Sequence, residues 1–130
     1  MKIKKAFEFM TKDVVTVKPE TPLVEVMNTL LDKHITGLPV VDDAGMLIGI
    51  VSEIDLVNPM SSGNADDTVA GEIMSTNLTT FAPEATCAEI ANCLAANRIR
   101  RVPIVDGGKV VGIVSRRDIL REMLSTYYDN

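Results

Sequence analysis

A serine and an aspartate recur with the same spacing at two places in this 130-residue chain. Ser52 and Asp55 end the stretch Gly-Ile-Val-Ser-x-x-Asp, and Ser115 and Asp118 end a second copy of it. A carboxylate can accept both hydrogen bonds from the 2′,3′-diol of a ribose. A serine that begins a helix lies beside free backbone N–H groups and a partial positive charge, which favour a phosphate. The repeated pair is therefore a candidate ligand-binding site.

Purely structural roles explain the same residue types. An aspartate in the first turn of a helix interacts favourably with the helix dipole, by about 0.3–1 kcal/mol. Serine is a favoured N-cap residue, and its hydroxyl group can cap the helix in one state and turn toward a phosphate in another. The sequence leaves both roles open for each pair.

Positive charge is concentrated in one segment of the chain. No lysine or arginine falls between His34 and Asn97, whereas seven fall from Arg98 to Arg121. The net charge of −5 and the absence of Trp argue against nucleic-acid binding, which needs a basic face or an aromatic stacking platform. The basic segment is either a solvated surface or a local site for a small polyanion.

The elements that must position these residues are also repeated. A shift of 64 positions (74 − 10) places Met10 on Met74 and Pro39 on Pro103, and one residue is then lost in a turn before the two Ser-x-x-Asp stretches coincide. Repeats of about 60 residues are marginal alone, so we expect the two halves to share one core. Duplicated halves usually pack about a pseudo-two-fold axis, which creates two related clefts.

Each repeat reads as helix, strand, long helix, strand, strand, helix. The elements expected in the first repeat are a lead-in helix over 4–9, a strand over 14–17, a helix with Thr21 as N-cap and Pro22 at N1, strands over 38–41 and 47–51, and a helix from Ser52. Their counterparts in the second repeat are 69–74, 78–81, a helix capped by Thr86, strands over 102–105 and 110–114, and a helix from Ser115. The segment 58–67 has the composition of a loop.

The remaining reactive residues favour structural roles. Cys87 and Cys93 lie six positions apart in an expected helix and point in different directions, so we expect no disulfide between them. His34 has no Cys, Asp or Glu spaced to form a metal site with it. No apolar run of signal or membrane length follows Met1, so a cytoplasmic protein is expected.

Together these features resemble a tandem pair of cystathionine-β-synthase (CBS) domains, the Bateman module. Two in-register copies carry the resemblance, each with a Met near its start, Ile-x-x-Leu/Val-Pro-Val/Ile-Val-Asp in its middle and Gly-Ile-Val-Ser-x-x-Asp before its last helix. The resemblance implies an α+β fold of two β-α-β-β-α units that pack sheet to sheet about a pseudo-two-fold axis. The first repeat is expected over 1–60 and the second over 61–130, with a linker at about 58–67.

The resemblance also implies a function. Such modules bind an adenosyl ligand (AMP, ADP, ATP or S-adenosylmethionine) in the cleft between the repeats, need no cofactor, and signal to a partner protein, often as a homodimer. Neither a nucleic acid nor a membrane is an expected partner. Catalysis is not expected, because no nucleophile–base pair or metal cluster is evident. The start at Met1 and the short tail favour a stand-alone protein over a piece of an enzyme such as inosine monophosphate dehydrogenase. The alternative is a dimeric scaffold whose clefts have lost the ligand.

The resemblance assigns site residues one by one. The residues implied in ligand binding are Ser52, Asp55, Ser115, Asp118, Arg100, Arg101, Thr16, Thr21 and Thr36. Asp55 and Asp118 would contact the ribose. Arg100 and Arg101 would reach the phosphates, for which a planar guanidinium fork is suited because it binds two oxygens.

The first repeat departs from this pattern. Thr36 and Gly37 stand at the positions that match the two arginines, so the two clefts are expected to differ in charge. Thr16 and Thr21 are weaker candidates near the adenosine, and Thr21 could act only as a helix cap.

Overall fold

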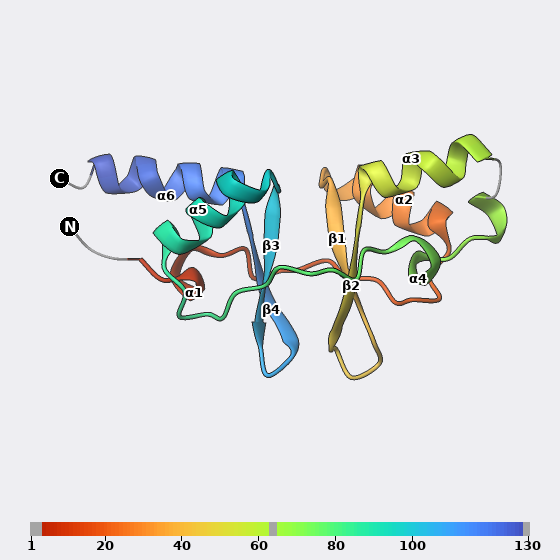
Figure 1. Cartoon of the computed structure of the whole chain (residues 1–130), viewed down its shortest axis with the longest axis horizontal. Coiled ribbons are helices and arrows are strands. Elements are labelled where there is room, and N and C mark those ends of the chain that lie inside the picture. Colours follow the sequence, from red (N-terminus) through yellow and green to blue (C-terminus); the bar gives the residue numbers. More distant parts are fainter. Residues whose placement is uncertain (1–3, 63–64, 129–130) are drawn as a thin grey trace. The chain divides into compact units, whose positions relative to one another are not determined.

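The chain folds into two compact units whose boundaries cross the sequence repeats. The computed structural model describes residues 4–62 and 65–128. One unit, here the central unit, is Val15–Leu78, and the other, here the terminal unit, combines the residues up to Val14 with those from Thr79 onward. Each unit holds one antiparallel two-stranded sheet, and its two longer helices lie on the same side of that sheet (Figure 1). The α+β fold expected from the sequence is confirmed.

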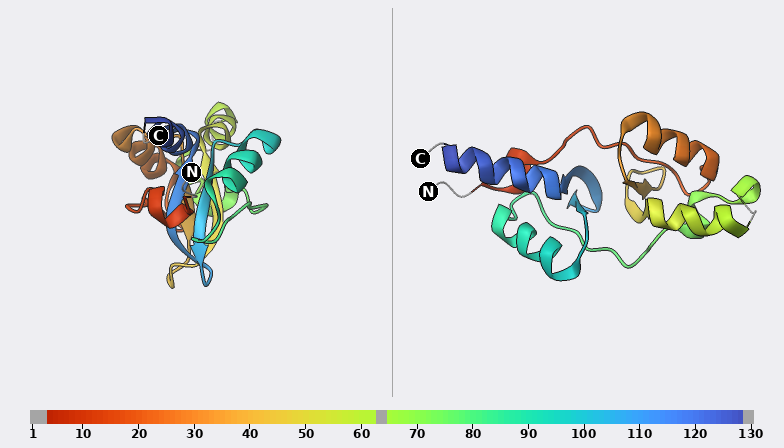
Figure 2. Two further views of the ribbon diagram at one scale, coloured as in Figure 1. Left: turned by 90° about the vertical axis from the view of Figure 1, so that its left-hand side faces the viewer. Right: turned by 90° about the horizontal axis from the view of Figure 1, so that it is seen from above.

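The same succession of elements occurs in both units. The central unit contains α2 (Leu23–Lys33), β1 (Gly37–Val41), β2 (Leu47–Ser52), α3 (Glu53–Ser62), a 3₁₀ turn (Ala65–Asp67) and α4 (Ala70–Ile73). The terminal unit contains α1 (Ala6–Phe9), α5 (Cys87–Asn97), β3 (Arg101–Asp106), β4 (Lys109–Ser115) and α6 (Arg116–Tyr128). Helix α5 packs against α6 and β3 (Figures 1 and 2).

The lead-in helix of each repeat completes the unit built on the other repeat. Helix α4 begins the second repeat in the sequence, yet the residue that follows Met74, Ser75, exchanges two backbone hydrogen bonds with Ile50 of β2, at 3.0 and 2.8 Å. Helix α1 is likewise held in the terminal unit, where Thr11 and Ile113 of β4 exchange two bonds of 2.9 Å. A unit is therefore one repeat minus its own lead-in helix, plus that of the other repeat.

Buried apolar residues form one cluster in each unit. Leu23, Val26 and Leu30 are the stripe that α2 turns toward the strand residues Leu38 and Val40. The matching residues of the terminal unit are Ile90, Leu94, Val102 and Ile104. The single shared core expected from the repeat length is therefore wrong. Each cluster is completed by a fully buried alanine of the exchanged lead-in helix, Ala70 or Ala6.

The segment expected as the first strand of each repeat contributes a single bridge. Val17 pairs in parallel with Val40, and Phe81 pairs in parallel with Ile104. Directly afterwards the chain turns, with i to i+3 backbone hydrogen bonds of 3.1 and 3.0 Å. The turn ends the pairing directly after this bridge.

One of the two expected helix caps is confirmed and the other is wrong. The hydroxyl oxygen of Thr86 accepts a hydrogen bond from the backbone N–H of Glu89 at 3.2 Å, as a capping threonine should. Helix α2 instead begins at Leu23 with Pro22 as its N-cap and no side-chain cap. Thr21 is not available for capping, because its hydroxyl oxygen accepts from the backbone N–H of Lys18 at 3.0 Å and closes the preceding turn.

Helical structure occupies much of the segment 58–67, which was expected to be a loop. Helix α3 continues to Ser62, and the 3₁₀ turn covers Ala65–Asp67. Polar composition did not end a helix that begins upstream at Glu53. Residues 63 and 64 of this expected linker lie outside the described residues.

Candidate ligand-binding site

The two Ser-x-x-Asp stretches have one geometry. Strand β2 ends at Ser52 and α3 begins at the next residue, and β4 and α6 meet in the same way at Ser115. The Oδ2 atom of Asp55 accepts from both the backbone N–H and the hydroxyl group of Ser52, at 2.9 Å each. The Oδ2 atom of Asp118 accepts from the same two groups of Ser115, at 2.8 and 3.0 Å. Each aspartate thus uses one oxygen to hold the start of its helix.

A reciprocal bond completes a capping box in the terminal unit. The backbone N–H of Asp118 donates to the hydroxyl oxygen of Ser115 at 3.3 Å. The structural role that the sequence left open is therefore present in this structure. It engages only the Oδ2 atom of the carboxylate, so the ligand role depends on what surrounds Oδ1.

The Oδ1 atom of Asp118 is engaged by two further side chains. The Nη1 atom of Arg121 lies 2.8 Å from it, and the hydroxyl group of Thr11 lies 3.4 Å away. The Asp118 side chain is only 4% exposed, whereas that of Arg121 is 69% exposed. The carboxylate is thus buried beneath an arginine that is itself largely in solvent.

The Oδ1 atom of Asp55 has no hydrogen-bond partner among the described side chains and backbone groups. The residue is half-buried rather than buried. In the sequence, uncharged Asn58 stands at the position that matches Arg121. The two carboxylates therefore share one geometry at Oδ2 and differ at Oδ1.

The structure places Thr36 beside the helix start of the central unit. The carbonyl oxygen of Thr36 accepts from the backbone N–H of Glu53, the first residue of α3, at 3.0 Å. The next residue, Gly37, pairs with Ser52 across the sheet. Thr36, Ser52 and Asp55 are thus brought together, and their role toward a ligand stays a prediction.

The matching place in the terminal unit carries positive charge. The carbonyl oxygen of Arg100 accepts from the backbone N–H of Arg116 at 3.0 Å, and Arg101 pairs with Ser115 across the sheet. Arg100, Arg116 and Arg117 are exposed, and Arg101 is half-buried. A strand end and a helix start therefore carry four guanidinium groups beside Ser115.

Among the described residues, no hydrogen bond connects Thr16 or Thr21 to the Ser-x-x-Asp pair. Thr16 is exposed and precedes Val17, whose backbone N–H donates to the carbonyl oxygen of Pro39 at 3.1 Å. The carbonyl oxygen of Thr21 accepts from the backbone N–H of Ala70 at 2.8 Å and so helps to hold α4. Their assignment to the ligand stays a prediction.

Sequence reasoning missed two residues of the terminal unit, Thr11 and Arg121. Arg121 follows Asp118 by three positions on a helix, a spacing that favours an ion pair and could have been noticed. Thr11 carries no comparable local signal, because it lies 107 positions from Asp118 in the sequence. Only the exchange of the lead-in helices brings it to the carboxylate.

Other reactive groups lie outside this site. Burial raises the pKa of the Cys87 thiol, and the negative charge of Glu122 raises it further. Within 4–62 and 65–128, no three His, Cys, Asp or Glu side chains are grouped so as to hold a metal ion. In the same residues no helix has the length and apolar character needed to cross a membrane. His34 ends α2 in the left-handed conformation, a structural position.

Comparisons with known proteins also find two copies of one domain in this chain. A family model described as CBS domain matches residues 6–62 and again residues 70–125. The inosine-5′-monophosphate dehydrogenase of Methanocaldococcus jannaschii is 34% identical over 121 residues, which are 92% of this chain and 23% of that enzyme. The chain spans only part of the length of such relatives: 44% of protein MJ1225 of the same organism, 23% of this dehydrogenase and 63% of CBSX1 of Arabidopsis thaliana.

Two solved structures are similar over nearly the whole chain. The CBS domain pair of protein MJ0100, in complex with 5′-methylthioadenosine and S-adenosyl-L-methionine, is 27% identical with a TM-score of 0.86, and covers 96% of this chain and 99% of that one. CBSX2 in complex with AMP is 30% identical with a TM-score of 0.85, and the match covers 95% of this chain and 98% of that one. Both of these proteins bind a compound that contains an adenosyl group.

Proposed function

This chain belongs to the CBS domain family, and we propose that it is a regulatory module that binds an adenosyl ligand and has no catalytic activity of its own. The observation that carries the proposal is the pair of aspartates, each held at a helix start with one oxygen engaged by a serine. The adenosyl compounds bound by MJ0100 and CBSX2 support it. In the proposed complex, a carboxylate accepts the hydrogen bonds of the ribose diol.

The charges of the terminal unit favour a ligand that carries phosphate. Arg100 and Arg101 lie next to Ser115, where the backbone N–H groups at the start of α6 add partial positive charge. A phosphate is attracted by both features, whereas the sulfonium cation of S-adenosylmethionine is repelled by them. For the site of the terminal unit we therefore rank AMP, ADP and ATP above S-adenosylmethionine.

Thermal unfolding with a panel of ligands tests this proposal. A ligand at one hundred times its dissociation constant should stabilise the chain by about 2.7 kcal/mol, which corresponds to a rise in Tm of several degrees. The rise should be lost in the double variant Asp55→Asn/Asp118→Asn and kept in Asp32→Asn, which removes an exposed charge on α2. No shift with AMP, ADP, ATP or S-adenosylmethionine would count decisively against ligand binding.

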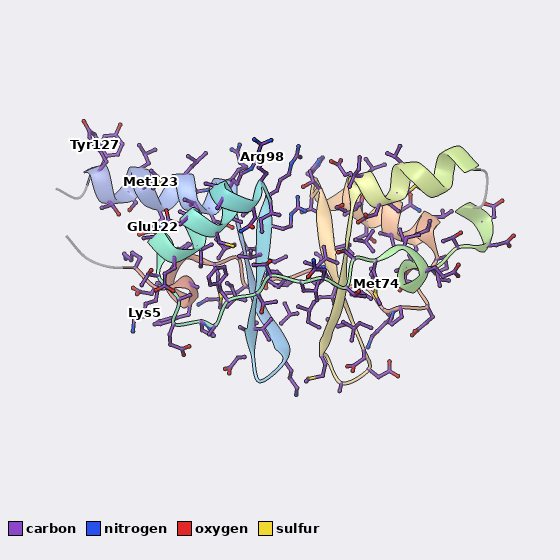
Figure 3. All side chains as sticks on the ribbon, in the orientation of Figure 1. Lys5, Met74, Arg98, Glu122, Met123 and Tyr127 are labelled. Atoms are coloured by element: carbon purple, nitrogen blue, oxygen red, sulfur yellow. The ribbon has the colours of Figure 1, made fainter. Side chains whose placement is uncertain are left out.

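The exposed face of α6 favours self-association of the chain. A homodimer fits the proposed ligand-binding module, and it also fits the alternative function, a scaffold that binds no ligand. Helix α6 presents a stripe of exposed apolar side chains with i, i+3, i+4, i+7 spacing, consisting of Leu120, Met123, Leu124 and Tyr127. Figure 3 shows Met123 and Tyr127 on the outer side of this helix. Such a stripe is typical of a helix that packs against a partner. We propose a second copy of the chain as that partner.

The mass in solution tests the stripe. Sedimentation should give a dimer for the natural chain and a monomer for Leu120→Glu/Leu124→Glu, because two charges cannot be buried in an apolar interface. A monomer at all concentrations would exclude this role for the stripe. The protein that receives the signal and the cytoplasmic location stay predictions of the sequence.

A further inference from the structure

The two proposed ribose acceptors differ in how much hydrogen-bonding capacity they have left. On the basis of the proposed function, we infer that Asp55 is the acceptor that receives the ligand first, and that Arg121 keeps Asp118 closed. Arg121 is in that case a residue that decides which of the two sites fills.

The inference rests on a count of acceptor positions. A carboxylate offers about four lone-pair positions, and a ribose diol brings two O–H donors. Asp118 already accepts from the backbone and hydroxyl groups of Ser115, from the Nη1 atom of Arg121 and from the hydroxyl group of Thr11. Asp55 accepts only the two bonds from Ser52 among the described groups. The positions that the described groups leave free on Asp55 thus match the needs of a diol, whereas Asp118 has none to spare.

Burial also distinguishes the two carboxylates, and it again favours Asp55 as the acceptor that a ligand can reach. Asp118 is 4% exposed, and Asp55 is half-buried. A buried carboxylate whose partner is removed is left as an uncompensated charge, so a ligand at Asp118 must replace the bond from Arg121 as well as bind.

The sequence rules out the same ion pair in the central unit. Arg121 has Asn58 at the matching position, so the central unit has no charged counterpart to form the ion pair. Thr11 is matched by Ser75, whose backbone is held on β2 in the same way as the backbone of Thr11 is held on β4. The difference between the units therefore depends mainly on one side chain, that of Arg121.

Calorimetric titration with adenosine tests the inference. Adenosine has the diol but no phosphate, so a change at Arg121 cannot act through lost attraction for phosphate. The natural chain should bind one adenosine, and Asp55→Asn should weaken this binding at least about tenfold, whereas Asp118→Asn should change it little. Thr11→Val/Arg121→Leu, which removes both donors to the Oδ1 atom of Asp118, should bind two adenosine molecules, and the same variant with Asp55→Asn should bind one. Lys109→Gln, which removes a positive charge at the start of β4, is the matched control and should behave as the natural chain does.

Three results would overturn the inference and leave the proposed function standing. They are two equal sites in the natural chain, binding that survives Asp55→Asn but not Asp118→Asn, and one site in Thr11→Val/Arg121→Leu. Circular dichroism checks that each variant is folded before it is titrated, and a variant that does not fold is replaced by the other variants in the comparison. A natural chain that binds neither adenosine nor AMP would overturn the proposed function, and the inference with it.

Discussion

The side chain of Met74 occupies the position that a Cβ atom on Gly49 would take, with its Cγ atom 2.7 Å from that point. Met74 follows α4 and Gly49 lies in β2, so this contact seats the exchanged lead-in segment on the sheet (Figure 3). The terminal unit repeats the arrangement with Met10 and Gly112, again with a Cγ distance of 2.7 Å.

Gly49→Ala should lower the free energy of unfolding by about 1–3 kcal/mol, because the added methyl group overfills this space. Chemical denaturation measures the change. In Gly49→Ala/Met74→Ala the clash is absent, so the two substitutions should be less than additive. Additive effects would mean that Met74 does not seat on Gly49.

Arg98→Gly should stabilise the chain by about 0.5–1 kcal/mol. Arg98 ends α5 with a φ of 53°, a left-handed conformation that glycine adopts without the penalty of a Cβ atom. Urea denaturation measures the gain. Arg98→Ala is the control: it removes the same charge but keeps the Cβ atom, and should bring no gain. Equal stabilisation by both substitutions would assign the effect to charge instead.

Thr86→Ala should destabilise the chain by about 1 kcal/mol, because the hydrogen bond that the Thr86 hydroxyl oxygen accepts from the backbone N–H of Glu89 is lost. Thr86→Ser keeps a hydroxyl group and should retain most of the stability. Thermal unfolding of the two variants gives the comparison, and an equal loss in both would show that the cap is not the cause.

Glu122→Gln should lower the pKa of Cys87, because the carboxylate of Glu122 is one of the two causes that raise it. Glu122 lies on the side of α6 toward α5, and its Oε1 atom is buried without a hydrogen-bond partner among the described residues (Figure 3). At a pH below the thiol pKa of both proteins, the variant with the lower pKa holds a larger fraction of Cys87 as thiolate, so iodoacetamide should alkylate it faster. At a pH above the thiol pKa of both proteins, the rates should converge.

The alkylation rate is best measured by mass spectrometry in a Cys93→Ser background, so that Cys87 is the reacting cysteine. Glu89→Gln removes an exposed carboxylate from α5 and should leave the rate unchanged.

The raised pKa of Cys87 also has a consequence for stability. The folded state holds the Cys87 proton more tightly than the unfolded state, so the free energy of unfolding should fall as the pH rises through the ordinary thiol range and beyond.

Local features of the chain were predictable from the sequence because they depend on neighbours along it. The repeat, the apolar stripe of α2 and the serine at each strand-to-helix junction follow from periodicity and capping preferences. The clustering of Thr36 with Ser52, and of Arg101 with Ser115, follows from the pairing of two strands joined by a short turn. The ion pair between Asp118 and Arg121 belongs to this class too, although it was not predicted.

Tertiary structure alone decided which lead-in helix completes which unit. Local preference places a short helix before each repeat but does not say which sheet it packs on, and packing on the other repeat gives each unit its own core. The same exchange brings Thr11 to Asp118 across 107 positions of sequence. Two aspartates that are identical in the sequence motif are thus placed in different surroundings, because burial and long-range hydrogen bonds are set by the packed chain rather than by the motif.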